Sequence, residues 1–515
     1  MLPKNSDAYA GKHSLTYVII PYGCCQALNS VLSSTYVILR ECSDRRISEI
    51  LRFAQDDTGR QEMHKRRLFG TSGVRGVVNQ DLSPDLCRQV ALAIGTILPP
   101  ASTVCIATDT RISRELIKEA VTAGLLSCSI NVVDLGISPT PALALLTRES
   151  GFAAGIMVTA SHNPPEFNGI KLFNGNSLGY SRAQEAEIEK IFFEKQFRQG
   201  KRGTLEQAQD MKQRYLSFIK SNLSLPGFNH QLKVVVDPGN GAASQFASYI
   251  LVQMGLDVIP INDEPDGLFP GRSPEPKADT LQGTVNFLRQ HNADLAICFD
   301  GDADRVVFCD KDGFLGFNQP IAFISRLAVK KTGKKKIATT VETGTLLDLA
   351  VKDLGVEVVR GRVGDVPVAH LAHELDAALG VEQVGVYIFP ELGYYPDSIF
   401  ASLFLLSKLS DAGEIRQFFR GIPRLFFEKA KIFCPDELKE LVMTQVNEKD
   451  HLFAPDEVNT LDGLRLEFPD SWMLIRASGT EPVIRVVSES TSQAQTDGLV
   501  SKGKELVQSL VEASR

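Results

Sequence analysis

A serine lies on a proline-bounded loop directly after an apolar run. Residues 153–158, Ala-Ala-Gly-Ile-Met-Val, are typical of a buried strand, and Ser161 lies in the polar segment 159–165 that follows. Pro164 and Pro165 restrict the backbone of this segment. The pattern predicts a hydroxyl fixed on a stiff loop at a strand end, which is a common place for catalytic groups on α/β scaffolds. The alternative is an ordinary proline-bounded turn.

Three carboxylates follow a second apolar run, residues 295–299. Alternate residues of an extended segment point the same way, so Asp300, Asp302 and Asp304 are expected to converge, with Arg305 as the adjacent cation. Such a group needs a hard divalent metal. It also leaves coordination positions for water or a phosphate oxygen, which suits Mg²⁺.

Two other interpretations of this acidic loop are a solvated turn and a calcium loop. An EF-hand would need a preceding helix and a glutamate at position 12, where this chain has Lys311. The apolar strand before the loop also disfavours an EF-hand. A rigid Ser161 together with an oxygen-rich metal site therefore indicates phosphoryl chemistry.

A loop rich in phosphate-binding groups follows the apolar run 472–475. An arginine, two hydroxyls, a glycine that exposes backbone N–H groups and a second arginine are typical of a phosphate nest. An ordinary hairpin loop is the alternative. The candidate phosphate ligands are Arg476, Ser478, Gly479, Thr480 and Arg485.

Four further residues are candidates for the same chemistry. Arg75 lies in a glycine-rich and hydroxyl-rich segment that is typical of an anion-contacting loop but lacks the P-loop lysine pattern. Lys171, ten residues after Ser161, is placed to return to the same cleft as a cation or proton carrier, and His162 adjoins the serine. Glu382, between glycines, is placed to accept hydrogen bonds from sugar hydroxyls, or it belongs to a helix end followed by a strand.

Composition bounds the class of protein. The 515 residues predict three to four domains, and a net charge of −7 argues against a general binder of nucleic acid or of anionic membranes. The nine cysteines lack CxxC spacing, which argues against a zinc site or a disulfide framework and favours a reducing cytoplasm. No apolar run reaches the roughly 18–20 residues that span a bilayer.

Three segments repeat a β-rich run, a turn and a helical pattern, which predicts α/β layers and three related domains. They are residues 104–109, 233–241 and 337–344. A charged helix is expected over 182–202. The expected parts are an atypical extension over 1–62, possibly preceding a functional start at Met63, α/β domains over 63–205, 206–312 and 313–425, and a smaller α+β domain over 426–515.

Together the motifs resemble those of the α-D-phosphohexomutase superfamily. The resemblance runs from about Leu68 to Glu512, and its three main parts are the serine loop, the Asp300–Asp304 loop and the Arg476 loop in the same order. The resemblance implies three α/β domains with mixed sheets and a smaller C-terminal α+β domain around a central cleft.

The resemblance also implies roles. Ser161 would carry a phosphoryl group and give one oxygen to the metal, with Asp300, Asp302 and Asp304 as the other ligands. Arg75, Lys171 and His162 would be catalytic, Glu382 would sort sugar hydroxyls, and the Arg476 loop would hold the phosphate that is not reacting. The serine would pass its phosphate to the sugar, giving a bisphosphorylated intermediate, and a sugar bisphosphate would activate the serine.

Some positions depart from the pattern. Many members have a second glycine, a serine and a histidine where this chain has Val381, Val384 and Val386, and Asp-Gly where it has Asp397-Ser398. The chain therefore resembles phosphoglucosamine-mutase-like and phosphomannomutase-like members that share these departures, and Asp462-Gly463-Leu464-Arg465 is also similar to the phosphoglucosamine-mutase-like group, to which the chain looks closest. A cytoplasmic monomer or homodimer acting on hexose or hexosamine phosphates is expected.

Alternatives remain open. Phosphomannomutase, phosphoglucomutase or phosphopentomutase activity would use the same site. An aspartyl-phosphate phosphatase would use the spacing of Asp300 and Asp302 but gives Ser161 no role. A catalytically weak sugar-phosphate-binding protein is suggested by the valines around Glu382.

Overall fold

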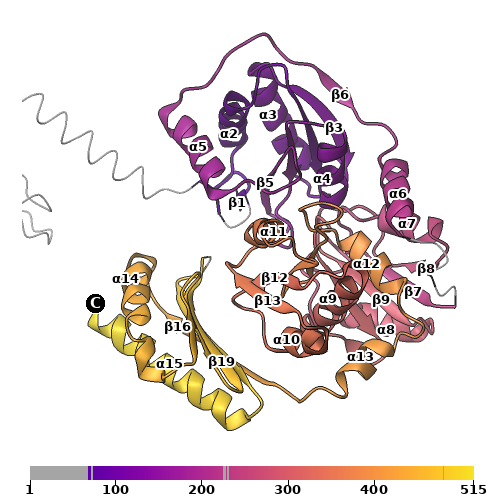
Figure 1. The fold of residues 1–515 in the computed structure, drawn as a ribbon. Coiled ribbons are helices and arrows are strands. Elements are labelled where there is room, and N and C mark those ends of the chain that lie inside the picture. Colours follow the sequence, from indigo (N-terminus) through magenta and orange to yellow (C-terminus); the bar gives the residue numbers. More distant parts are fainter. Residues whose placement is uncertain (1–67, 71–72, 224–227, 229–230, 480, 515) are drawn as a thin grey trace, which may run out of the picture. The chain divides into compact units, whose positions relative to one another are not determined.

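A computed structural model describes residues 68–514 except 71–72, 224–227, 229–230 and 480. The expected extension over 1–62 and the proposed start at Met63 lie outside the described residues. The described elements form three α/β layers and a C-terminal sheet with its own helices (Figure 1). This confirms the fold class predicted from the sequence.

The first sheet is mixed, with the order β1-β5-β4-β2-β3-β6. Strands β2, β3, β4 and β6 run parallel, whereas β5 is antiparallel to both β4 and β1. Its strands are β1 (Val74–Val77), β2 (Thr103–Thr108), β3 (Asn131–Ile137), β4 (Ala154–Val158), β5 (Phe167–Asn174) and β6 (Leu205–Gln207). The associated helices are α2 (Pro84–Ile97), α3 (Arg114–Ser127), α4 (Thr140–Glu149) and α5 (Arg182–Glu194).

Two of these helices test the sequence patterns. Helix α2 begins where a serine followed by proline predicts it, and the Ser83 side chain accepts a hydrogen bond from Leu86 N at 3.1 Å. The expected helix over 182–202 was too long. It ends at Glu194 because Lys195 adopts the left-handed conformation, and Arg198 then donates to the carbonyls at the end of α2.

The second sheet has the order β11-β10-β9-β7-β8 and the third has the order β13-β12-β14-β15. The second contains β7 (Lys233–Asp237), β8 (Asp257–Pro260), β9 (Leu295–Phe299), β10 (Val306–Asp310) and β11 (Gly313–Phe314), with α6 (Met211–Asn222), α7 (Ala247–Gln253) and α8 (Gln282–Gln290) nearby. The third contains β12 (Lys336–Thr340), β13 (Glu357–Gly361), β14 (Leu379–Glu382) and β15 (Val386–Ile388). Its helices are α9 (Asn318–Thr332), α10 (Leu346–Val351), α11 (Asp365–Glu374), α12 (Ser398–Leu406) and α13 (Glu414–Phe419).

One four-strand pattern recurs in all three sheets. In each, the first strand (β2, β7 or β12) lies between the second and the third, which run parallel to it, and the fourth is antiparallel to the third. The three repeated segments found in the sequence become these first strands. The repeat therefore gives three equivalent loops, each joining a third strand to a fourth.

The C-terminal sheet is antiparallel throughout, with the order β16-β20-β19-β18-β17. Helices α14 and α15 cover one of its faces (Figure 1). Its elements are β16 (Phe426–Phe433), α14 (Asp436–Asn447), β17 (Glu457–Asn459), β18 (Leu464–Phe468), β19 (Ser471–Ala477), β20 (Val483–Ser490) and α15 (Gln493–Ala513).

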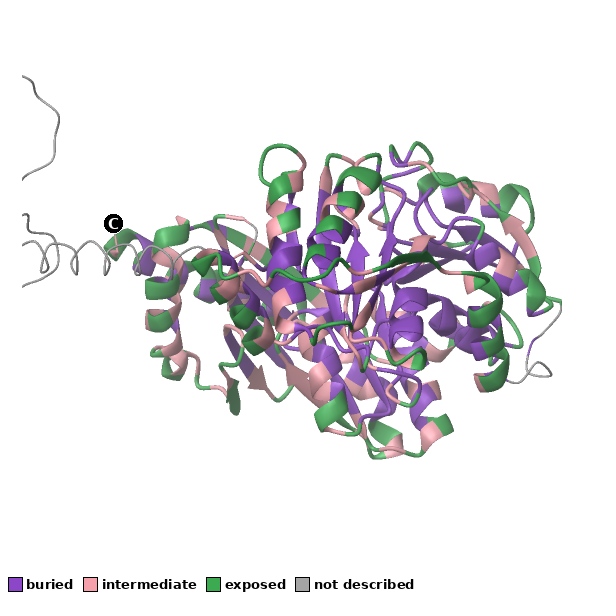
Figure 2. Ribbon diagram, turned by 90° about the horizontal axis from the view of Figure 1, so that it is seen from above, coloured by how far each residue is buried: buried purple, intermediate pink, exposed green. Residues whose placement is uncertain are grey.

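The apolar cores link the layers. One buried cluster is continuous through α4, α6, α7, α9 and α12, so the three α/β units share a core. The central strands are buried, while exposed residues lie on outer helices, on loops and on the edge strands β6 and β16 (Figure 2). Among the described residues, none of the helices combines the length and the apolar character that crossing a bilayer requires.

A buried hydrogen bond joins α6 to α12 within this shared core. The Tyr215 hydroxyl donates to Asp397 Oδ1 at 2.5 Å, and the same oxygen accepts from Phe400 N at the start of α12. Burial raises the pKa of Asp397 to about 6, although these hydrogen bonds favour its charged form.

Replacing Tyr215 with phenylalanine is expected to lower the free energy of unfolding by about 1–3 kcal/mol, because a buried carboxylate loses one donor. Tyr249→Phe is the matched control, since that hydroxyl bonds to Gln213 at an exposed position and should cost less than about 0.5 kcal/mol. Urea denaturation measures both. Equal effects would contradict the importance of the buried bond.

Candidate active site

The three equivalent loops carry the main sequence-predicted residues. The β4–β5 loop contains Ser161, and the β9–β10 loop contains the three aspartates. Glu382 is the last residue of β14, at the start of the third loop. Strand ends of this kind are where α/β folds place ligand sites.

Ser161 is held in an unusual conformation. Its φ is 52°, a left-handed value that is uncommon for serine, and its side chain is fully buried. Its hydroxyl donates to Asp300 Oδ2 at 2.6 Å. Arg111, itself paired with Asp109, donates to the carbonyls of Ser161 and Asn163 and so fixes the loop. The strain is of a kind that clusters at functional sites.

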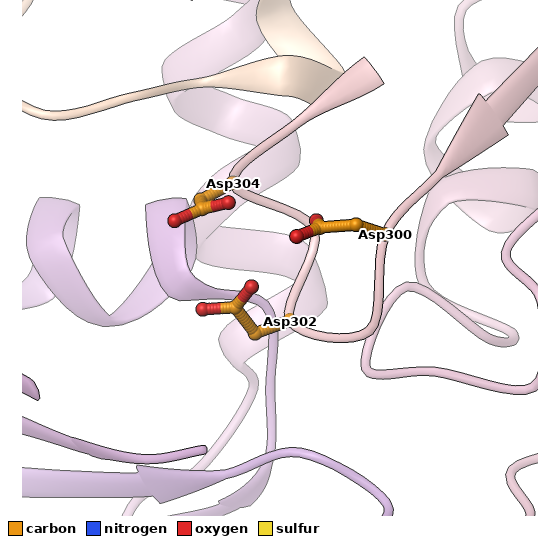
Figure 3. Close-up of side chains that lie close together, drawn as sticks. All are labelled: Asp300, Asp302 and Asp304. Atoms are coloured by element: carbon orange, nitrogen blue, oxygen red, sulfur yellow. The ribbon is translucent and has the colours of Figure 1, made fainter. Parts of the chain in front are cut away.

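The acidic loop gathers its three carboxylates at one point (Figure 3). One oxygen from each of Asp300, Asp302 and Asp304 lies within 4.8 Å of the others. Asp302 Oδ2 accepts a hydrogen bond from Thr140 Oγ1 at 2.7 Å. Asp302 Oδ1 and Asp304 Oδ1 are buried and accept no hydrogen bond from the described residues. Buried oxygens of this kind fit a cation.

Electrostatics leads to the same conclusion. Burial, and then the charges of Asp304 and Asp302, raise the pKa of Asp300 well above its ordinary value. Burial also raises the pKa of Asp302 to about 6, with Asp304 adding to the shift. The triplet is therefore under-compensated, and its residues fit a hard divalent ion, whose charge would stabilise all three carboxylates.

Lys171 returns to this site on β5. Its Nζ donates to Asp304 Oδ2 at 2.6 Å and forms an ion pair with Asp365 Oδ2 at 2.7 Å. Burial alone would lower the pKa of Lys171, but Asp304 and Asp365 raise it above its usual range. Burial likewise opposes the charge of Asp304, yet Lys171 and Arg305 hold the pKa of that carboxyl well below its usual value. Lys171 is thus a fixed cation beside the acidic loop.

Arg75 and His162 lie beside the serine loop. Arg75 is on β1 opposite Gly169, and its Nη1 donates to Ala160 O at 3.4 Å. Its Nε is buried and has no hydrogen-bond acceptor among the described residues, so it can donate to an added anion. His162 Nδ1 is 3.4 Å from Ser161 Oγ. Burial, and then Arg305 and Arg75, lower the pKa of His162 to about 3, so the imidazole is neutral at neutral pH.

Glu382 is the acidic group of the third loop. Its Oε1 accepts from Gly364 N at 3.0 Å, and burial raises its pKa to about 7 against the charge of Arg305. The third loop also touches the second, because Val306 N donates to Gly385 O at 2.9 Å. Gly385 has φ 89°, and a Cβ there would lie 2.4 Å from Val306 O, so only glycine fits.

The valines that replace polar residues of the resemblance pack in apolar clusters. Val381 is fully buried in the core shared by the three α/β units, and Val386 is buried beside α11. Val384 is partly buried against the same α11 cluster. These three positions therefore add apolar contacts to the third loop and no polar group.

The Arg476 loop forms a separate cluster that joins the C-terminal sheet to Glu342, which follows β12. Arg476 pairs with Glu342 and Asp462, both at 3.1 Å, and Arg485 pairs with Glu481 at 2.8 Å. Lys431, Arg485 and Arg476 are register partners across β16, β20 and β19. Ser478 is buried, Gly479 is exposed, and Thr480 lies outside the described residues.

Several residues beside the site were not singled out from the sequence. Thr140 contacts Asp302, and Asp365 contacts Lys171. Arg111 holds the serine loop, as described above. Behind the acidic loop, Arg272 pairs with Asp237 and donates to Phe299 O at 2.6 Å. The sequence contains only weak signals for these residues. Asp365 follows a glycine, and Thr140 precedes a proline at the start of a helix.

Comparison with known families covers most of the chain. Domains I, II and III described as "Phosphoglucomutase/phosphomannomutase, alpha/beta/alpha" match residues 66–199, 213–313 and 318–423. The C-terminal domain of the same description matches residues 434–502.

Individual proteins of the same family are similar to this chain over most of its length. A probable phosphoglucosamine mutase of Pyrococcus horikoshii is 39% identical over 450 residues, which are 86% of this chain and 98% of that protein. A phosphoglucomutase/phosphomannomutase of Thermococcus kodakarensis is 34% identical over 86% of this chain and 98% of its own length. The crystal structure of a Burkholderia thailandensis phosphoglucomutase/phosphomannomutase family protein superposes with a TM-score of 0.74 at 26% identity, covering 86% of this chain and 97% of that one.

The under-compensated triplet predicts a pH dependence of the metal-free protein. The folded Asp302 carboxyl holds its proton up to about pH 6, whereas its ordinary pKa is 3.8. The folded state therefore binds more protons than the unfolded state between these values, and stability falls as the pH rises. Relative to Asp302→Asn, the free energy of unfolding of the wild type should drop by on the order of 2–3 kcal/mol between about pH 4 and pH 6.

Magnesium chloride should reverse this loss in the wild type and leave Asp302→Asn unchanged. Asp312→Asn, an exposed acid beyond β10, is the control and should behave like the wild type. Urea titrations with and without EDTA measure each case. A wild type that is insensitive to Mg²⁺ would refute the metal site.

Proposed function

Because this chain belongs to the phosphoglucomutase/phosphomannomutase family of α-D-phosphohexomutases, which are isomerases, we propose that it interconverts the 6-phosphate and 1-phosphate of glucosamine through a phosphoserine at Ser161. One observation carries the assignment. The strained, buried Ser161 hydroxyl donates to Asp300 within the carboxylate triplet. This hydrogen bond supports Ser161 as the phosphoryl carrier beside the proposed metal ligands.

The chain's own groups suit phosphoryl transfer. Bound Mg²⁺, held by Asp300, Asp302, Asp304 and an oxygen at Ser161, would spread the negative charge of a loose transition state. Lys171 stays protonated, so it adds fixed positive charge on the other side of Asp304.

The transfer occurs twice. First, the bond from phosphorus to Ser161 Oγ breaks while a bond to a sugar hydroxyl oxygen forms, giving a sugar bisphosphate. After the sugar turns over, its other phosphate returns to Ser161 and the isomeric monophosphate leaves. Arg75, with a buried free donor, would hold the transferring group, and a sugar bisphosphate would restore serine that has lost its phosphate.

The other end of the substrate would meet the Arg476 loop. Within the described part of the chain, the ion partners of Arg476 and Arg485 are carboxylates, which a phosphate dianion can replace, and the two cations lie opposite one another in the sheet. Gly479 and Ser478 would add backbone and hydroxyl donors. This loop would therefore hold the non-reacting phosphate.

The sugar preference is argued from charge. Burial and the charges of Asp365 and Glu342 raise the pKa of Glu382, whereas Arg305 lowers it. This excess of carboxylates around Glu382 and the β14–β15 loop would favour binding of a sugar that carries an ammonium group, such as glucosamine. The second candidate is phosphoglucomutase/phosphomannomutase activity, the name carried by the Thermococcus kodakarensis relative.

Two other readings of the site are less well supported. An aspartyl-phosphate phosphatase needs a free Asp300 nucleophile, but Asp300 here accepts hydrogen bonds from Ser161 and from Arg305 N. A weak sugar-phosphate-binding protein needs no strained nucleophile, whereas Ser161 is strained. Both alternatives leave features of the site unexplained.

Ser161→Ala should abolish turnover of glucosamine 6-phosphate, with a loss of at least about 10³-fold, because the phosphoryl carrier is gone. Ser177→Ala is the matched control, since Ser177 is also buried with a left-handed φ of 62° in the same domain. Coupled assays and intact mass measure turnover and the phosphoryl group. Turnover or phosphorylation retained in Ser161→Ala would overturn the mechanism.

Glu382→Gln should lower kcat/KM for glucosamine phosphate about 10–100-fold more than for glucose phosphate, since a charged hydrogen bond to ammonium is worth about 1.5–3 kcal/mol. Glucose, mannose and N-acetylglucosamine phosphates should be poorer wild-type substrates. Steady-state assays across these sugars test this. A wild-type preference for a neutral sugar would favour the phosphoglucomutase/phosphomannomutase alternative.

A further inference from the structure

Lys171 connects all three α/β units through two buried ion pairs. It lies on β5 of the first unit, Asp304 lies in the β9–β10 loop of the second, and Asp365 begins α11 of the third. The side chains are 2%, 4% and 10% exposed, respectively. A charge network this deeply buried is held with little screening by solvent.

Asp365 is also tied to the sugar-binding loop. It directly follows Gly364, whose N–H donates to Glu382 Oε1 at 3.0 Å. One short segment therefore holds Glu382 with a backbone donor and Lys171 with a carboxylate. A shift of this segment would move both contacts together.

Helix α11 is packed against the first unit, which gives this segment a fixed position. A Cβ at Gly179 would lie 2.3 Å from Val366 Cγ2, so the backbones approach closely. His370 Nε2 lies 3.0 Å from Gly179 O, and Leu178 joins the cluster that contains Val368. The α11 start is thus located by packing that is independent of the ion pair.

We propose that Asp365 is a positioning residue that holds the Lys171 ammonium beside Asp304 of the carboxylate triplet and links this position to Glu382 at the start of the β14–β15 loop. The inference rests on the proposed phosphotransfer function. Asp365 acts through Lys171. Its carboxylate forms the second ion pair of Lys171 Nζ, so that Nζ lies between Asp304 and Asp365 instead of interacting with Asp304 alone. The lysine is then held where a transferring phosphoryl group needs positive charge.

Asp365→Asn keeps the size and shape of the side chain but removes the charge that attracts Lys171. We expect kcat to fall about 10–100-fold, while KM and the calorimetric Kd for glucosamine 6-phosphate change less than about twofold. Asp365→Glu keeps the charge and should recover a substantial part of kcat. The melting temperature of each variant is measured in parallel.

His370→Ala is the matched control, because it removes a contact of the same helix with the same unit but does not touch Lys171. It should retain kcat within about twofold. The proposal is overturned if Asp365→Asn and His370→Ala lower kcat equally, if the loss lies in KM or Kd, or if Asp365→Glu is no better than Asp365→Asn.

A coupling test covers the case in which Asp365→Asn is too unstable to assay. In protein that carries Lys171→Met, which leaves no buried ammonium unpaired, Asp365→Asn should cause no further loss in single-turnover transfer from phosphorylated Ser161, because the residues act as a unit. Additive losses would overturn the proposal. If instead the wild type isomerises none of the sugar phosphates, the proposed function fails. If the wild type is active but substitution of Asp365 leaves kcat unchanged, only the role of Asp365 fails.

Discussion

The burial of several carboxylates around one lysine is the constraint on which the site depends. Asp300, Asp302 and Asp304 lie on one loop, Asp365 approaches from another unit, and Lys171 is the ammonium among them. Lys171, Arg305 and Arg75 together compensate this charge only in part, since the pKa values of Asp300 and Asp302 stay raised while that of Asp304 is lowered. An additional cation follows from the charge imbalance itself, independently of any likeness to other proteins.

The fold meets this constraint by repetition. Three copies of one four-strand pattern place three equivalent loops at strand ends, and each contributes a different chemistry: a hydroxyl, a carboxylate triplet and a single glutamate. Because α4, α6, α7, α9 and α12 share one apolar core, the three loops are held by packing far from the charges. The strained φ of Ser161 and the buried carboxylates are costs that this core offsets.

Local patterns in the sequence predicted many of the elements and singled out most of the residues that the structure gathers at the three loops. The run before Ser161, the Asp300–Asp304 alternation and the Ser83-Pro84 helix start are each encoded within a few residues, and the last appears in the structure as expected. The helix expected over 182–202 extends only to Glu194, because Lys195 adopts the left-handed conformation. Beyond it, Arg198 makes long-range hydrogen bonds, which no local periodicity reports. Asp365 was missed for the same reason, since its partner Lys171 is distant in the chain.

The C-terminal sheet also carries uncompensated charge, but here the charge is positive. Lys431, Arg485 and Arg476 lie opposite one another on three strands, and like charges in such positions destabilise a sheet. Glu481 and Glu342 compensate part of this charge, but their ion pairs are partly exposed and so contribute little. A dianion would interact with the whole row at once. Under the proposed function, a sugar with two phosphates would meet both imbalances, since its reacting group would approach a cation held by the triplet while its other group would lie on the row. A substrate that exchanges its two ends would therefore find the same two environments after it turns, which is the symmetry that the interconversion of 1- and 6-phosphates requires.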